Sequence, residues 1–197
     1  EGLSDTDLIK LTQWSENGHY YLFIDNKTSW AKAYNRAKEF KLGGQRGYLV
    51  TITSKDELKF LISLNNKSIW TSGTCLLMND GSMIGDQSIS VITKGALKYG
   101  NINNRPPSSY NDFYWAAGPE SGAKIDSSLY TANEPNESND PFSATDNTLS
   151  DIQSHESCIM TIISNATLND IKEGNYPDYY VPANGMVIEF GGYADGA

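Results

Sequence analysis

The stretch that decides the fold is residues 47–57, Gly47-Tyr-Leu-Val-Thr-Ile-Thr-Ser-Lys-Asp-Glu57. Its first half is rich in aromatic and β-branched residues, which predicts a short strand over 48–52. Ser54 and Glu57 then form the Ser-x-x-Glu pattern of a capping box. We therefore expect a helix to begin directly after this strand and to run to about Leu64.

The flanking sequence predicts a second helix and further strands. Ser29 can cap a helix that runs to about Phe40, with apolar residues at helical spacing and glycines in 42–47 to end it. Strands are predicted at 19–25, 69–72, 113–117, 158–163 and 186–190. Two helices followed by strands and long loops indicate an α+β fold with antiparallel pairing. Trp30, Trp70 and Trp115 are predicted core residues.

Length and charge limit the class of protein. The chain has 197 residues, which fits a single domain over 1–197 with insertions near 79–112 and 137–153. The formal net charge of -9 argues against a nucleic-acid partner and against docking on anionic membranes. No apolar run is long enough to insert into a membrane.

Two cysteines, Cys75 and Cys158, leave the redox state open. They are too few for a disulfide framework, and no CxxC pair suggests zinc. One bridge between them and a pair of buried thiols are both compatible with the sequence.

Oxygen-bearing side chains gather in the last third of the sequence. Glu134-Pro135-Asn136 places a carboxylate and an amide on either side of a proline, and a cis Glu134–Pro135 bond would aim both at one point. Glu156 comes two residues before the strand at 158–163. Asn169 and Asp170 are expected in a turn after a strand.

These five side chains form an all-oxygen ligand set that suits calcium. Calcium takes roughly 6–8 oxygen ligands, so five side chains leave places for a ligand's hydroxyl groups. Each motif alone is more often a solvated turn than a metal site, so the prediction depends on the complete set.

Motifs along most of the chain resemble those of C-type lectin-like domains, in their long microbial or invertebrate style. The resembling segments are 18–21, 29–37, 47–57, 69–73, 114–122, 134–136, 156–158, 168–170 and 185–190. The resemblance implies a C-type lectin-like fold, two helices flanking antiparallel sheets, with a long loop region that binds calcium and ligand.

The same resemblance implies the roles of individual residues. The Ca²⁺ ligands would be Glu134, Asn136, Glu156, Asn169 and Asp170. Glu134, Asn136, Glu156 and Asn169 would also contact a sugar. Glu-Pro-Asn implies equatorial vicinal hydroxyls, as in mannose, fucose, glucose or N-acetylglucosamine.

Departures from the family pattern concern its disulfides and one loop. Glu173 stands where a partner for Cys158 would be, and apolar residues near Ala37 and at Ile188 replace the outer bridge. The insertion at 137–153 contains Asp140, Asp146 and Asp151. These acids would close over the ligand, bind further calcium or simply be solvated, and solvation is the favoured interpretation.

The resemblance predicts a calcium-dependent carbohydrate-binding protein that is extracellular or on the cell surface, with adhesion as one role. We expect this segment to be one module of a larger surface protein and not to be an enzyme, because no nucleophile–base pair is apparent. The alternative is a protein-binding C-type lectin-like domain with structural calcium or none. A third alternative is a catalytic domain of the formylglycine-generating type, but this sequence lacks the reactive cysteine arrangement of such domains.

Overall fold

The computed structural model describes residues 4, 7, 10–75, 113–135, 156–172 and 183–192. The elements in chain order are β1 (Thr12–Gln13), β2 (Tyr20–Ile24), α2 (Trp30–Ala37), β3 (Lys41–Leu42), β4 (Gln45–Arg46), β5 (Tyr48–Leu49), α3 (Lys55–Asn65), β6 (Ile69–Thr74), β7 (Tyr114–Trp115), a 3₁₀ turn (Ser127–Leu129), β8 (Cys158–Ile162), β9 (Thr167–Ile171) and β10 (Gly185–Phe190). The insertions expected near 79–112 and 137–153 lie outside the described residues.

Most of the strands form one mixed sheet in the order β1-β2-β10-β6-β8-β9, with β5 on β10 and β7 on β6. The predicted α+β class is confirmed, but the expectation of purely antiparallel pairing is wrong in one place. Strand β10 pairs in parallel with β6, with Gly185 opposite Ile69. Parallel neighbours need a long connection, and more than a hundred residues separate these two strands in the sequence.

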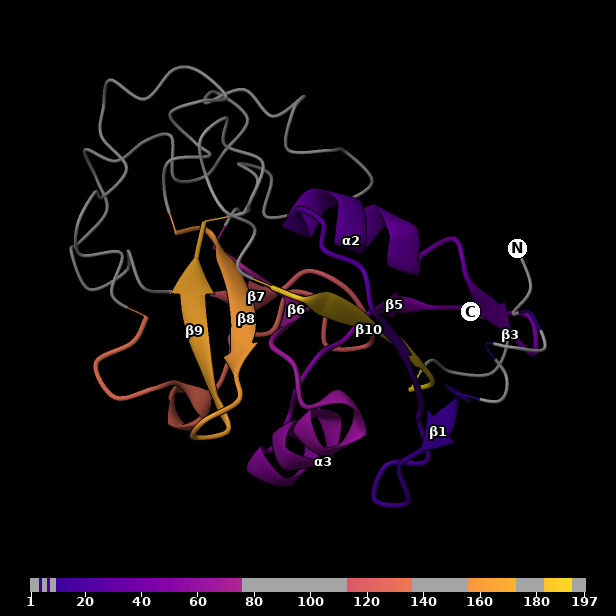
Figure 1. Ribbon diagram of the computed structural model, residues 1–197, viewed down its shortest axis with the longest axis horizontal. Helices are drawn as coiled ribbons and strands as arrows, with labels where there is room; N and C mark the ends of the chain where they lie inside the picture. The colour runs from indigo at the N-terminus through magenta and orange to yellow at the C-terminus, as the bar shows by residue number, and fades with distance from the viewer. Residues whose placement is uncertain are drawn as a thin grey trace.

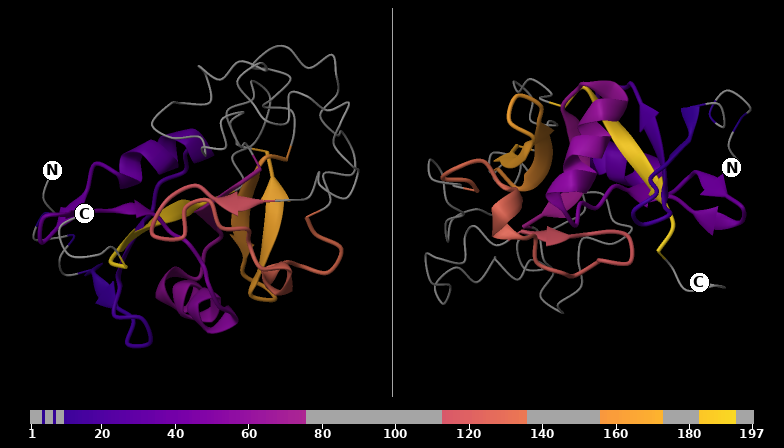
Figure 2. Two further views of the ribbon diagram at one scale, coloured as in Figure 1. Left: turned by 180° about the vertical axis from the view of Figure 1, so that it is seen from behind. Right: turned by 90° about the horizontal axis from the view of Figure 1, so that it is seen from below.

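The segment 47–57 forms the strand and the helix start that its sequence predicts. Strand β5 pairs with β10, and Val50 continues the ladder by donating to Val187 and accepting from Ser72. Ser54 then caps α3, accepting a hydrogen bond from the main-chain nitrogen of Glu57 at 3.1 Å. Helices α2 and α3 lie on opposite sides of β10 (Figure 1), and α3 lies in front of the strands when the molecule is seen from below (Figure 2).

Helix α2 begins as expected and ends early. Ser29 caps it by accepting from the main-chain nitrogen of Lys32, but the helix stops at Ala37 and not near Phe40. The glycines expected to end it instead turn the β3–β4 hairpin, since Gly43 and Gly44 have φ values of 56° and 90°. Positive φ at both positions is the backbone that tight hairpins need.

The core contains the three predicted tryptophans, with exposed fractions of 0% for Trp30 and Trp70 and 3% for Trp115. The Trp30 indole donates to the main-chain oxygen of Thr71 at 2.7 Å, which joins α2 to β6. Cys75 and Cys158 are buried, and no disulfide bridge joins them. Within the described segments, no helix is long and apolar enough to cross a membrane.

The cap of α3 gives a direct test of this arrangement. Ser54→Ala removes the acceptor for a first-turn N–H group and should cost about 1 kcal/mol of unfolding free energy in urea titrations. Ser63→Ala, near the end of the same helix, is the matched control and should change stability by less than about 0.5 kcal/mol. Equal losses in the two variants would contradict the role of Ser54.

Candidate functional site

Asn169 and Asp170 lie inside strand β9 and not in a turn, so that expectation is wrong. Strands β8 and β9 form a hairpin in which Asp170 is opposite Ile159 and Asn169 is opposite Met160. The turn is instead the four residues 163–166, between the strands. The low strand propensity of Asn and Asp misled the prediction, because pairing with β8 outweighs it.

The chain before Glu134 runs along the outer side of β9. Tyr130 forms a parallel bridge with Leu168, and the Thr131 main-chain nitrogen donates to the Leu168 oxygen at 2.9 Å. The hydroxyls of Thr131 and Thr167 are 2.7 Å apart. A turn then follows, in which the Glu134 nitrogen donates to the Thr131 oxygen. The Glu134–Pro135 bond is cis, as expected.

This pairing fixes which end of the hairpin each predicted carboxylate approaches. Because 130–131 run parallel to β9, the chain advances from Leu168 toward the end of β9 that contains Asp170. Glu156 precedes β8, whose first residue Cys158 is opposite Ile171 at that same end. Glu134, Glu156 and Asp170 therefore all belong to the end of the hairpin away from its turn.

The individual side chains differ in burial. Asp170 is 1% exposed, and its Oδ1 atom is buried, as is the Oε2 atom of Glu134. Glu134, Glu156 and Asn169 are half-buried as whole residues. The Asn169 amide nitrogen donates to the Asp170 main-chain oxygen at 2.7 Å, which leaves its carbonyl oxygen as the group to offer a metal.

The described residues alone do not form a closed metal cage. Among them, no three His, Cys, Asp or Glu side chains come together closely enough to hold a metal ion. Neighbouring side chains on a strand also point to opposite faces, which separates Asn169 from Asp170. Asn136 and the acids Asp140, Asp146 and Asp151 lie outside the described residues, as does Glu173.

A second polar cluster, which the sequence did not point to, is buried between β2, β10 and α3. The Tyr21 hydroxyl donates to Oε1 of Glu57 at 2.6 Å and lies 3.3 Å from Oε1 of Glu189. Both carboxylates are 1% exposed. Nδ1 of His19 lies 2.6 Å from Oε1 of Glu189, so the ring is the counter-ion of this carboxylate when it is protonated. The only sequence signal was Glu189 within the apolar run 186–190.

Burial and hydrogen bonding shift the titration of these groups. The hydrogen bond to Glu189 raises the pKa of His19. Burial raises the pKa of Glu57, although hydrogen bonds from Thr53 oppose this shift. Two carboxylates this close are compatible with burial because main-chain and hydroxyl donors, together with the imidazolium, stabilise them. The cluster links β2, β10 and α3 through buried hydrogen bonds, so its role is to stabilise the fold.

No protein-family model matches the sequence, and a search of curated proteins gives no match. Solved structures do match: the C-type lectin CEL-I from Cucumaria echinata superposes with a TM-score of 0.51 at 14% identity, over 91% of this chain and 96% of that one. Human lithostathine gives 0.51 at 13% identity, over 96% of each chain. The chain has a C-type lectin-like fold.

The EPNH mutant of CEL-I superposes with a TM-score of 0.52 at 14% identity, covering 95% of this chain and 96% of that one. Structural matches at identities this low establish the C-type lectin-like fold alone. The chemistry must therefore be argued from this chain's own residues. In this fold the β8–β9 hairpin with segment 130–135, and the buried His19 cluster, are separate features.

The His19 cluster predicts how stability depends on pH. The charged imidazole stabilises the fold fully below its ordinary pKa of 6.5, and this contribution is lost as the pH rises through the higher folded-state pKa. His19→Gln cannot titrate, so its urea stability should fall less than the wild type's as the pH rises above 6.5. The carboxylates of Glu57, Glu120 and Glu189, whose charges act on the ring, remain in both proteins. Parallel pH profiles would contradict the assignment.

Proposed function

We propose that this protein binds carbohydrate with the help of one calcium ion, at the end of the β8–β9 hairpin away from its turn. The observation that supports this most strongly is the bonding of Tyr130 and Thr131 along β9. It directs the chain toward Glu134 at the end of the hairpin to which Glu156 and Asp170 belong. The C-type lectin-like fold and the lectin CEL-I among its structural relatives favour a sugar as the ligand.

The chemistry of the proposed donors fits calcium. Three carboxylates drawn to one point would repel, and a divalent cation would reduce their combined charge to about -1. The amide oxygens of Asn136 and Asn169 complete a hard, all-oxygen set. Vicinal sugar hydroxyls would take the vacant coordination places, while Glu134 accepts hydrogen bonds from them and the amides donate. This preference for mannose-, fucose-, glucose- or N-acetylglucosamine-type hydroxyls is part of the proposal.

A second candidate is a protein-binding C-type lectin-like domain with structural calcium or none. The absence of a three-acid group among the described residues favours it. For either candidate we propose an extracellular or cell-surface module of a larger protein, acting by binding and not by catalysis. Adhesion would follow for a sugar-binding module, because weak single sites gain affinity through repetition.

Calcium should raise the melting temperature of the wild type, because it binds only the folded chain. At a hundredfold excess over Kd, the stabilisation would be about 2.7 kcal/mol. Glu134→Gln should abolish most of this shift while leaving the circular dichroism spectrum unchanged. Asp25→Asn, an exposed carboxylate that pairs with Lys67, is the matched control and should respond to calcium as the wild type does. A wild type indifferent to millimolar calcium would contradict the metal site.

A glycan array in calcium and in chelator separates the two candidate functions. The proposal expects binding to mannose-type glycans that chelator abolishes and that Asn169→Asp greatly weakens, since the amide can no longer donate. A chain that takes up calcium but binds no glycan would support the protein-binding alternative. Glycan binding unaffected by chelator would contradict calcium-dependent recognition.

A further inference from the structure

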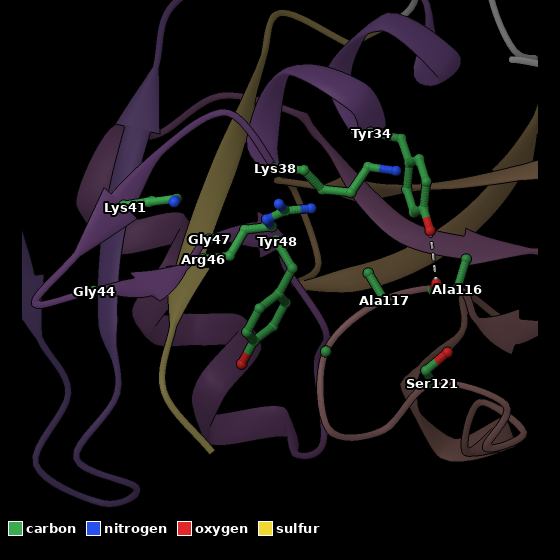
Figure 3. A pocket seen from close by; sticks show the side chains of 11 residues that line it. Tyr34, Lys38, Lys41, Gly44, Arg46, Gly47, Tyr48, Ala116, Ala117 and Ser121 are labelled. Atoms are coloured by element: carbon green, nitrogen blue, oxygen red, sulfur yellow. Dashed lines mark hydrogen bonds between the residues drawn. The ribbon is translucent and has the colours of Figure 1, made fainter. Parts of the chain in front are cut away.

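A concave pocket of about 560 Å³ lies between the end of α2, the β3–β4 hairpin, β5 and residues 116–121. Its volume is within the range of small-molecule sites. Figure 3 shows Lys41 on one side of the pocket and Tyr34 on the other, with Arg46, Tyr48 and Lys38 between them. Lys38 contributes a third cation, and no acidic residue is among the described side chains that line it.

The strongest observation is a like-charge pair in the hairpin wall. Lys41 is directly opposite Arg46 in the two-stranded β3–β4 sheet. Like charges that face each other across two strands destabilise the pairing. Within the described part of the chain, neither residue makes an ion pair with an acid. Both are exposed at the pocket, so an anion between them would relieve this repulsion.

Two tyrosines, Tyr34 and Tyr48, form the opposite wall and the floor of the pocket. The Tyr34 hydroxyl donates to the Ala116 oxygen at 2.9 Å, and Lys38 Nζ lies 4.4 Å from the centre of the Tyr34 ring. Gly118 contacts the Tyr48 ring so closely that an added Cβ would be 2.6 Å from it. Tyr34 and Tyr48 are 5% and 2% exposed, and Trp30 stacks on the Tyr34 ring. The tyrosines therefore close the bottom of the pocket and present little surface of their own to a ligand.

Charge decides the ligand class. The carboxylate of Glu120 lies close to the pocket, where it accepts from the Thr51 hydroxyl at 2.9 Å and lies beside Gly118. The chain as a whole carries -9, so it would repel an extended polyanion or an anionic membrane. A single small anion can still be held, because Arg46 presents a planar fork that matches sulfate or carboxylate oxygens.

We propose that this pocket binds the sulfate or carboxylate group of an acidic saccharide without calcium. The anion lies between Lys41 and Arg46, and the sugar ring occupies the rest of the pocket, which a single small anion would leave unfilled. This inference does not depend on the calcium site, because the pocket lies at the β3–β4 side of the sheet and the β8–β9 hairpin at the other (Figure 1).

The test is NMR titration of the ¹⁵N-labelled chain in chelator, following the amide signals of Gly44, Gly47 and Gly118. The probes are N-acetylglucosamine 6-sulfate, neutral N-acetylglucosamine, and inorganic sulfate and phosphate. The sulfated sugar should shift these signals and bind at least about tenfold more tightly than the neutral sugar or either free anion. Equal binding of a free anion would mean a simple ion site and would overturn the proposal, as would equal binding of the neutral sugar.

Paired variants separate the pocket from bulk charge. Lys41→Gln with Arg46→Gln should weaken binding of the sulfated sugar at least about tenfold. Lys32→Gln with Lys59→Gln changes the net charge equally outside the pocket and should leave binding unchanged. In buffer free of multivalent anions, Lys41→Gln should also melt at a higher temperature than Lys32→Gln, since it removes the like-charge pair. Equal weakening by the two pairs, or no gain in melting temperature, would count against the site.

Discussion

The pairing of β10 with its neighbours is the constraint on which the rest of the structure depends. All six residues of this last strand are buried, and they pair with β2, β5 and β6. The chain therefore completes its sheet only when its final segment inserts between its first strands and β6. Side chains that β10 contributes then organise what lies around it: Ile188 packs close to Gly47, and Glu189 binds His19 and Thr51.

The position of both candidate binding features follows from this central strand. Beyond β6 the sheet continues to β8 and β9, which support segment 130–135 and the predicted calcium residues. On the other side, β5 joins β10 and is preceded directly by the β3–β4 hairpin with its two opposed cations. The two features are thus separate in space, and one can be disturbed without the other.

Local patterns made much of the fold predictable. Ser29 and Ser54 identified both helix starts because a capping hydroxyl has a local partner three residues later. The resemblance carried by motifs along most of the chain, with 47–57 among them, predicted the fold, and the solved structures confirm it. The parallel β6–β10 pair was missed because the two strands are far apart in the sequence. The strand position of Asn169 was missed because it depends on pairing with β8 across a turn of only four residues. The buried Glu57 was expected only as a helix cap, since nothing local reveals that Tyr21 donates to it.

The candidate calcium site was predicted as a set of residue types. The central claim of the proposed function is that the ion keeps coordination places open for sugar hydroxyls. The most direct test replaces Ca²⁺ with Tb³⁺ and excites it through nearby tyrosine and tryptophan side chains, such as Tyr130. Luminescence lifetimes in H₂O and D₂O then count the water molecules on the ion. We expect sensitised emission and a loss of about two waters when mannose is added, one for each hydroxyl that enters the coordination sphere. Absence of emission, or a water count that mannose leaves unchanged, would contradict this claim.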